Sequence, residues 1–318
     1  MTFAELPMVL FTVLAQMSVG AFLVLGVVQT LGSLKFQSAT IDRVADPALY
    51  AIGPTLVLGL FASIFHMHDI FNVFNVVRGF QTSWLSREII FGMAFAGSGF
   101  LFALMQWFKW GTPRLRQAIA AITALLGVGL VYVMSMIYYT LPSVPAWNTW
   151  FTPVQFALTT VLLGSLAVGT AFMTVTMFRR HRLERGGKIF GARVAPERGD
   201  HVKVNQLLAT SLRWIAVTVV VSGGLLMVLI PLHLSKMAGL GEVGVESLAP
   251  YSGTLLVLRL ALVAAGAGLV AIFMYAFAKA KSNPRPLAIA VTLAFGLVLA
   301  GELLGRAQFY ESMVRIGM

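Results

Sequence analysis

The residues best suited to acid–base chemistry gather between Ser63 and Glu88, in the segment SIFHMHDIFNVFNVVRGFQTSWLSRE. This segment holds His66, Asp69 and Glu88, in a chain of which only 11% of the residues are charged. Ionisable groups in so apolar a chain are costly to keep and mark candidate functional sites. A neutral histidine has a pKa of about 6.5, so it can accept a proton at working pH, and a nearby carboxylate can pass the proton on. The segment therefore predicts a site where a substrate loses protons.

A lipid-borne hydroquinone fits these groups. Its oxidation releases protons and electrons in equal number, so its site needs proton acceptors, an aromatic slot for the ring and a path to water. We predict that His66 accepts a proton and that Asp69 or Glu88 relays it outward. Phe74 and Trp84 are among the aromatic residues expected to enclose the ring. The alternative for His66 is an ordinary interfacial residue at the end of a membrane span.

The composition predicts a polytopic membrane protein. Of 318 residues, 58% are hydrophobic, and the mean hydropathy is +0.85. Soluble domains carry about 25% charged residues, more than twice the proportion here. The sequence has no cysteine, which excludes cysteine-ligated iron–sulfur clusters and thioether-attached haem. The start of the chain lacks the basic region of a cleavable signal peptide, so we expect it to form the first helix.

Hydropathy predicts an all-α bundle of eight transmembrane helices, forming a single domain over residues 1–318. The expected spans are Pro7–Leu31, Ala48–Met67, Ile89–Phe108, Leu115–Tyr139, Thr152–Phe178, Gln206–Leu232, Tyr251–Ala278 and Leu287–Gln308. A short outer amphipathic connector is expected at 68–87, and a basic cytoplasmic loop at 179–205. The six tryptophans fall at span ends or in connectors, where an interfacial aromatic belt lies.

The distribution of basic residues sets the predicted orientation. The connectors on one side of the membrane carry 16 Lys and Arg residues, whereas the other side carries 5. The positive-inside rule then places both termini on the outer, periplasmic side of the cytoplasmic (inner) membrane. The net charge of +11 indicates contact with anionic lipid heads and gives no support for nucleic-acid binding.

Polar residues inside the predicted spans share the outer half of the bilayer. At about 1.5 Å of rise per residue, Gln16 lies roughly 13 Å and Arg259 roughly 12 Å from the outer ends of their spans. Glu302 lies near the outer end of the last span, so a single outer pocket is expected. Arg259 and Glu302 either set the geometry of this pocket or only tie two helices together. Arg306 is expected to extend its charge to the interface, and the small-residue pair Gly301 and Gly305 to mark a close helix contact.

A haem is the rival ligand for the histidines. A transmembrane haem b needs two histidines on facing helices at matched depth, but His66 and His233 both fall at the outer rim. We therefore expect neither haem nor an iron–sulfur cluster in this chain.

The chain resembles the membrane-anchor subunit of dimethyl sulfoxide reductase, an eight-helix quinol-oxidising protein, over nearly its full length. The motifs that carry the resemblance are LPMVLFTVLAQMSVGAFL, SIFH, TSWLSREI (82–89), IYYTLPSVPAWNTWFTP (137–153), the Arg259 helix and AGELLGRAQFY (300–310). In that family the histidine ending the second span and the glutamate at the third are associated with menaquinol oxidation. The matching positions here are those of His66 and Glu88, and positions between them also match: Phe74, Asn75, Ser83 and Ser86. The sequence departs from the family after the histidine, where it reads Met67-His68-Asp69 without the usual proline.

The resemblance implies a substrate and partners that the residues alone do not show. Menaquinol or ubiquinol would be oxidised here, and the electrons would pass to a four-cluster iron–sulfur subunit. A catalytic subunit with a molybdopterin centre would complete the complex on the outer face. The alternatives are the same subunit run in reverse as a quinone reductase, a structural anchor, or an anion transporter with its site at Arg259.

Overall fold

Seven helices in the described part of the chain are long and apolar enough to cross a membrane. The computed structural model describes residues 6–38, 40–46, 48–50, 53–54, 78–184, 198–251, 253–277 and 284–316. The long helices are α1 (Leu6–Ser33), α4 (Trp84–Phe108), α5 (Pro113–Tyr139), α6 (Phe151–Glu184), α7 (Arg198–Ala238), α9 (Thr254–Phe277) and α10 (Pro284–Glu311). A short helix α8 (Glu242–Leu248) and the turn Ala249–Tyr251 join α7 to α9. No strand occurs within these ranges, and the predicted span Ala48–Met67 lies almost wholly outside them.

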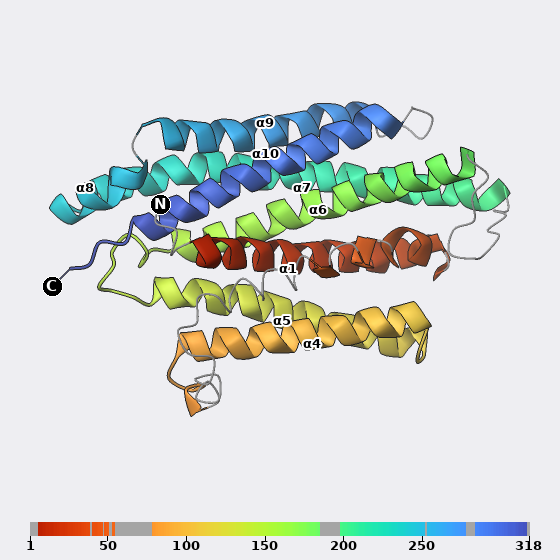
Figure 1. Ribbon diagram of the computed structural model, residues 1–318, viewed down its shortest axis with the longest axis horizontal. Coiled ribbons are helices and arrows are strands. Elements are labelled where there is room, and N and C mark those ends of the chain that lie inside the picture. Colours follow the sequence, from red (N-terminus) through yellow and green to blue (C-terminus); the bar gives the residue numbers. More distant parts are fainter. Residues whose placement is uncertain are drawn as a thin grey trace.

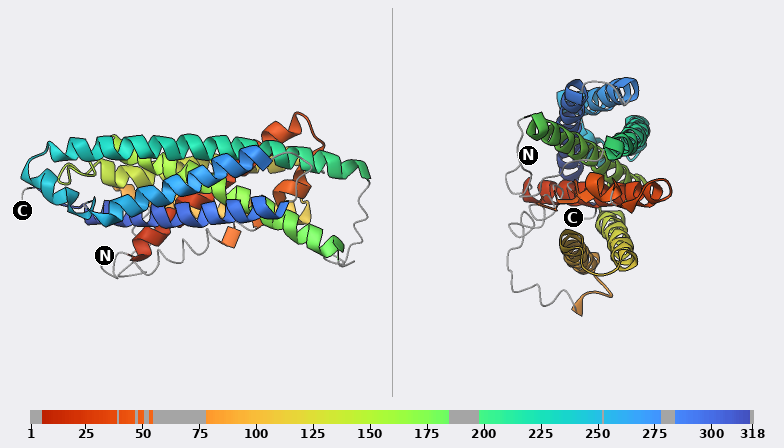
Figure 2. Two further views of the ribbon diagram at one scale, coloured as in Figure 1. Left: turned by 90° about the horizontal axis from the view of Figure 1, so that it is seen from above. Right: turned by 90° about the vertical axis from the view of Figure 1, so that its right-hand side faces the viewer.

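The helices form a bundle with α1 near its centre. Helix α1 packs against α6, α5 and α10, while α4 packs on α5, and α9 packs on α10 and α7. Viewed along the bundle, α1 lies between the α4–α5 pair and the remaining helices (Figure 2). The contact between α1 and α6 is close at Gly20 and Gly164, where an added Cβ would collide with the backbone of the other helix. Glycine is therefore required at this crossing, as in other close helix contacts in membranes.

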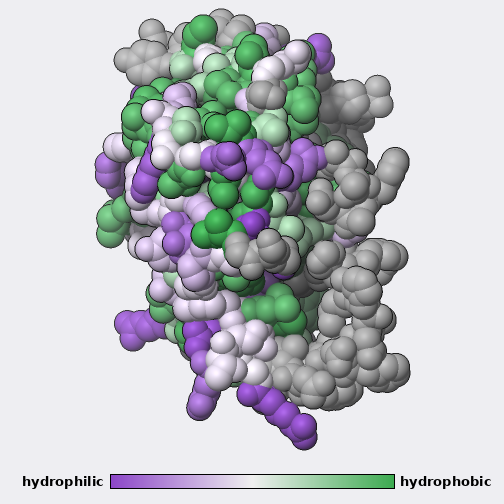
Figure 3. Space-filling view, turned by 90° about the vertical axis from the view of Figure 1, so that its left-hand side faces the viewer, coloured by the Kyte–Doolittle hydropathy of each residue, from purple (hydrophilic) through white to green (hydrophobic). Residues whose placement is uncertain are grey.

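Helix α1 begins, and helix α10 ends, at the same end of the bundle, which we call the terminal end (Figure 1). The starts of α4, α6 and α9 lie at this end too, as do the ends of α5 and α7. Figure 3 looks onto the terminal end, where hydrophilic side chains lie between apolar ones. The turn from α4 to α5 lies at the opposite end (Figure 1).

Local capping fixes where α4 and α5 begin. Ser83 accepts a hydrogen bond from the backbone N–H of Ser86, and Thr112 accepts one from Leu115. Both are N-caps that satisfy an otherwise unpaired backbone donor. Helix α4 ends at Phe108, where Lys109 takes a left-handed conformation with φ 54°. The turn from α4 to α5 therefore covers residues 109–112.

Several helices extend beyond the predicted spans. Helix α4 begins at Trp84 and not at Ile89, because Ser83 caps it, so Glu88 lies in the second turn rather than opening the span. Helices also enter both ends of the predicted basic segment 179–205, since α6 continues to Glu184 and α7 begins at Arg198. A helix satisfies its own backbone hydrogen bonds in water as well as in lipid, so the end of an apolar run need not end the helix.

Candidate functional site

The structure brings polar side chains from α1, α4, α5, α6, α9 and α10 together near the terminal end. We call this set the polar layer. Its members are Thr12, Gln16, Glu88, Tyr138, Thr159, Arg259, Glu302, Arg306 and Tyr310. Each is buried, and the most exposed of them, Glu88, has a relative exposure of 7%. Buried polar groups need hydrogen-bond partners, so the partners define how the layer is built.

Glu88 is the member contributed by α4. It is buried on the helix that packs on α5, the helix of Tyr138. Two other predicted site residues have local roles: Ser83 is the N-cap, and Trp84 carries the guanidinium of Arg87 over its ring at 4.2 Å. Ser86 is buried beside them, next to Gly79. The predicted site residues His66, Asp69, Phe74 and Asn75 lie outside the described residues.

A chain of hydroxyl groups links α5, α10 and α1. The hydroxyls of Tyr138 and Tyr310 are 3.1 Å apart, and Tyr310 donates to Thr12 Oγ1 over 3.3 Å. Thr12 in turn donates to the carbonyl of Met8 over 2.9 Å. Aromatic rings surround this chain, with Trp147 and Phe309 both edge-on to Tyr138. The hydroxyls are therefore held in fixed positions inside the bundle.

Arg306 lies in the centre of the polar layer. Its Nη2 donates to Gln16 Oε1 over 2.8 Å, and Gln16 Nε2 donates to the carbonyl of Phe156 over 3.1 Å. The Arg306 guanidinium also stacks on the Phe156 ring, with Cζ 3.8 Å from the ring centroid. Its relative exposure is 2%, so the expectation that it reaches the interface is wrong. The residue faces α1 and α6 and not the lipid, and the stacking on Phe156 replaces part of its hydration.

Glu302 joins α10 to α6 and α9. Its Oε2 accepts a hydrogen bond from Thr159 over 2.6 Å, and its Oε1 lies 4.0 Å from Arg259 Nη2. The separation of Arg259 and Glu302 is that of an ion pair without a direct hydrogen bond. An added Cβ at Gly305 would collide with the Arg259 guanidinium, so this glycine makes room for the charge. Gly301 packs against Val263 of α9, as expected for a close helix contact.

The two arginines of the polar layer have incomplete hydrogen bonding. Arg259 and Arg306 are both buried, with Glu302 as the carboxylate between them. Within the described part of the chain, Arg259 Nε and Nη2 and Arg306 Nε and Nη1 have no hydrogen-bond partner. Buried cations with incomplete hydrogen bonding cost free energy, so we infer that a layer of this kind is retained for a reason other than stability.

His233 lies near the end of α7 and is buried. Its ring stacks on Phe151 at 4.3 Å with an interplanar angle of 12°. Among the described residues, no three His, Asp or Glu side chains lie together as metal ligands would. In this position His233 acts as a packing residue.

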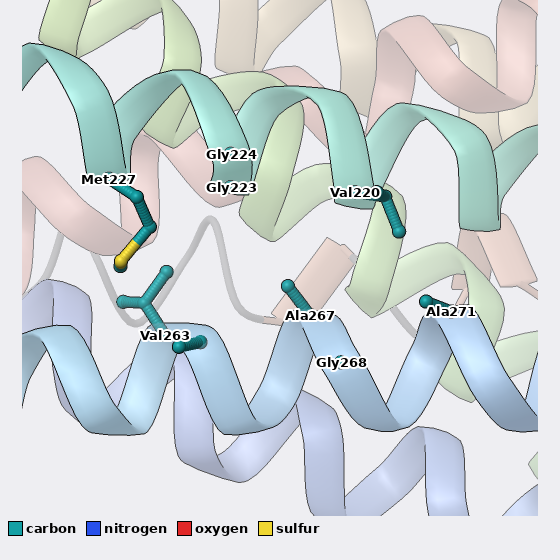
Figure 4. Close-up of a pocket in the computed structure, with 9 residues that line it drawn as sticks. Val220, Gly223, Gly224, Met227, Val263, Ala267, Gly268 and Ala271 are labelled. Carbon is teal, nitrogen blue, oxygen red and sulfur yellow. The ribbon is translucent and has the colours of Figure 1, made fainter.

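A groove between α7 and α9 is apolar, in contrast to the polar layer (Figure 4). Its volume is about 210 Å³, and its lining is apolar or glycine throughout, including Val220, Gly223, Met227, Val263 and Ala267. The groove offers no group for acid–base chemistry. The polar layer is therefore the candidate site in the described part of the chain.

Comparison of the sequence with known proteins identifies its family. Residues 1–311 match the model of the DMSO reductase anchor subunit (DmsC). The protein belongs to the DMSO reductase anchor subunit family. It is 27% identical over 315 residues to one polypeptide of the anaerobic dimethyl sulfoxide reductase of Escherichia coli strain K12, covering 99% of this sequence and 96% of that protein. The corresponding polypeptide of Haemophilus influenzae is 34% identical over 194 residues, covering 60% of this sequence and 66% of that protein.

A third relative belongs to a different enzyme. One subunit of the sulfite dehydrogenase of Allochromatium vinosum is 28% identical over 152 residues, covering 43% of this sequence and 45% of that protein. The resemblance inferred from the motifs is confirmed by the family match. These relatives are subunits of multi-subunit enzymes, and the family is one of membrane anchors.

The sequence reasoning missed Thr159 of the polar layer, and it also missed Thr12, Tyr310 and the inward direction of Arg306. A signal for the last three was present. Thr12 and Gln16 are four residues apart, and so are Glu302, Arg306 and Tyr310 along α10. Residues four apart share one helix face, so placing Gln16 and Glu302 inward also places Thr12, Arg306 and Tyr310 inward.

Proposed function

We propose that this subunit binds menaquinol or ubiquinol near the terminal end and oxidises it. The electrons pass to a docked four-cluster iron–sulfur subunit and then to a catalytic subunit with a molybdenum centre. The protons leave toward the same, periplasmic side of the inner membrane. The reaction balances, because each quinol yields one quinone, two electrons for the partner subunits and two protons for water.

One observation carries this proposal: the buried ionisable groups of several helices meet at the terminal end of an anchor-family protein. A subunit that only held its partners to the membrane would need no buried carboxylates and arginines there. A quinol needs proton acceptors at a fixed place, and Glu88 supplies one. The sequence contains no cysteine, so cysteine-ligated clusters would belong to the partner subunits.

We assign roles to the predicted residues on this basis. His66 takes one proton from the quinol, and Glu88 takes the other; Asp69 relays a proton to the outer water. Phe74, Asn75 and Trp84 would contact the ring. Ser83 and Ser86 shape the start of α4, and Gln16, Arg259 and Glu302 hold the polar layer behind the site.

The test is quinol oxidation by the purified complex carrying His66→Ala or Glu88→Gln. We expect each variant to assemble and to lose most quinol oxidation while still reducing its terminal acceptor with an artificial donor. Glu246→Gln, an exposed carboxylate on α8, is the matched control. Wild-type quinol oxidation in both site variants would leave a structural anchor as the function.

The relative named as part of a sulfite dehydrogenase favours a second candidate, quinone reduction by the same site. A dehydrogenase supplies electrons, so its anchor would pass them to quinone. Turnover of the complex with quinol, and separately with quinone plus a reduced donor, distinguishes the two directions. The same Glu88→Gln variant should impair both, because a proton transferred at one site is transferred in either direction.

A further inference from the structure

The direction of the hydrogen bonds in the hydroxyl chain follows from counting donors. A threonine or tyrosine hydroxyl has one proton to donate, and a carbonyl can only accept. Thr12 donates its proton to the carbonyl of Met8, so it must accept from Tyr310. Tyr310 has then used its proton, so the contact between the two tyrosines is a donation from Tyr138 to Tyr310. Every hydroxyl proton of the chain therefore points away from Tyr138 toward α1.

This order leaves Tyr138 with lone pairs and no free proton. Its hydroxyl can accept a further hydrogen bond, but it can donate one only if the chain breaks. Glu88 is a buried carboxyl group of α4, the helix that packs on the α5 helix of Tyr138. An ionised Glu88 would need a donor, whereas a protonated Glu88 carries an O–H that needs an acceptor. Tyr138 is thus matched to the protonated form.

We propose that Tyr138 accepts a hydrogen bond from Glu88 once Glu88 has taken a proton from the quinol, and that Tyr310 and Thr12 hold Tyr138 in this accepting role. This inference rests on the proposed function, since the proton comes from the quinol hydroxyl. The quinol O–H bond breaks, the Glu88 O–H bond forms, and the electrons leave to the iron–sulfur partner. Tyr138, Tyr310 and Thr12 are positioning residues, because they stabilise the product of the proton transfer without touching the quinol.

Thr12 gives the sharpest test because it lies at the far end of the hydroxyl chain from Glu88. Thr12→Val keeps the shape of the side chain but removes the acceptor of the Tyr310 proton. Tyr310 can then turn its proton toward Tyr138, and Tyr138 becomes a donor. We expect kcat for quinol oxidation to fall roughly tenfold, the value of one hydrogen bond in the barrier, with KM unchanged. Tyr138→Phe should give the same pattern.

Two controls separate this role from packing. Thr12→Ser restores the hydroxyl and should restore kcat. Thr123→Val makes the same change at a buried threonine of α5 that donates to Ile119 and lies outside the hydroxyl chain, and it should leave kcat and KM as in the wild type. If Thr12→Val does not accumulate, Tyr310→Phe breaks the same chain from α10.

The outcomes distinguish this inference from the function on which it rests. Normal kcat in Thr12→Val and Tyr138→Phe, with Glu88→Gln impaired, overturns the inference and leaves the quinol site intact. A raised KM with unchanged kcat also overturns it, because the hydroxyl would then contact the quinol itself. Normal kcat in Glu88→Gln alone overturns the inference, because Glu88 would then take no proton from the quinol. Normal kcat in both Glu88→Gln and His66→Ala contradicts the proposed function, whatever the hydroxyl variants do. Loss of assembly in Thr12→Val, Tyr138→Phe and Tyr310→Phe alike makes the hydroxyl chain structural and overturns the inference.

Discussion

Two charged clusters lie at opposite ends of the bundle, and they are built differently. At the end opposite the termini, Lys109 donates to Asp42 and to Asp46, each over 2.8 Å, and Gln106 donates to the same two carboxylates. The Lys109 side chain is 48% exposed, so water also solvates these charges. In the polar layer, Arg259 and Glu302 are 1% and 2% exposed, and their closest atoms are 4.0 Å apart.

The difference shows how each cluster relates to function. Partly exposed charges that are hydrogen-bonded to each other lose little hydration free energy on folding, and they add little to the free energy of unfolding. Buried charges with incomplete partners lower stability, and proteins keep them where chemistry needs them. The cluster around Lys109 therefore holds the α4–α5 turn to the segment after α1, whereas the polar layer serves the proposed quinol site. Substitutions in the polar layer should therefore lower the Tm more than substitutions in the cluster around Lys109.

Glu302→Gln should have the largest effect. The amide can still accept from Thr159, but two buried guanidinium groups lose their shared carboxylate. Breaking a buried ion pair costs about 3–5 kcal/mol. We expect little of the variant in membranes and a strongly lowered Tm of the purified complex. Glu311→Gln, at the end of the same helix, is the control. A normal Tm for Glu302→Gln would show that the polar layer resembles the Lys109 cluster after all.

Gln16→Leu should have the next largest effect. It removes the acceptor of the Arg306 Nη2 proton and the donor to the Phe156 carbonyl. A hydrogen bond to a charged group contributes roughly 1.5–3 kcal/mol. The Tm of the variant should fall, and denaturant titration should give the same order of loss. Gln155→Leu is the matched control, because Gln155 is equally buried but its Oε1 has no hydrogen-bond partner in the described part of the chain. Equal losses in both variants would contradict the role given to Gln16.

Gly305→Ala tests whether the Arg259 charge needs its space. The added methyl would push the guanidinium away from Glu302, and overpacking of this kind costs about 1–3 kcal/mol. Gly296→Ala on the same helix meets no atom within 4 Å, and it should leave the Tm unchanged or raise it, because alanine favours the helix. A Tm ranking with Gly296→Ala below Gly305→Ala would contradict the packing of Arg259 on α10.

The sequence was enough to predict the helices but not their lateral contacts. Long apolar runs have one stable form in lipid, so hydropathy located seven described helices and only misplaced their ends. Which residues face each other depends on packing between helices far apart in the chain. Tyr138 and Tyr310 are 172 positions apart, and nothing local to either indicates the other.

Arg306 shows that depth in a span does not predict the orientation of a side chain. Its distance from the helix end suggested that it reaches the interface, but depth does not determine which way a side chain points. The spacing of four residues from Glu302 does determine it, because both then lie on one face. Amphipathic spacing among the rare polar residues of a span is thus a better guide to the site than depth alone.

Lys109→Met should have the smallest effect, less than about 1 kcal/mol, as for exposed ion pairs generally. Partial burial alone would lower the pKa of Lys109, but its hydrogen bonds to Asp42 and Asp46 raise it above the usual lysine value of 10.5. The pKa of Lys109 is higher in the folded state than the usual 10.5 of the unfolded chain, so protonated Lys109 stabilises the fold. This stabilisation is fully present below pH 10.5 and is lost as the pH rises through the higher pKa of the folded state. The Tm difference between the wild type and Lys109→Met should therefore be small and constant from neutral pH up to 10.5, and it should shrink only above that. Lys35→Met, which removes an exposed charge from the same end, is the control and should leave the Tm at neutral pH unchanged. A large Tm difference at neutral pH would mean that the charges of the Lys109 cluster contribute more to the free energy of unfolding than those of the polar layer.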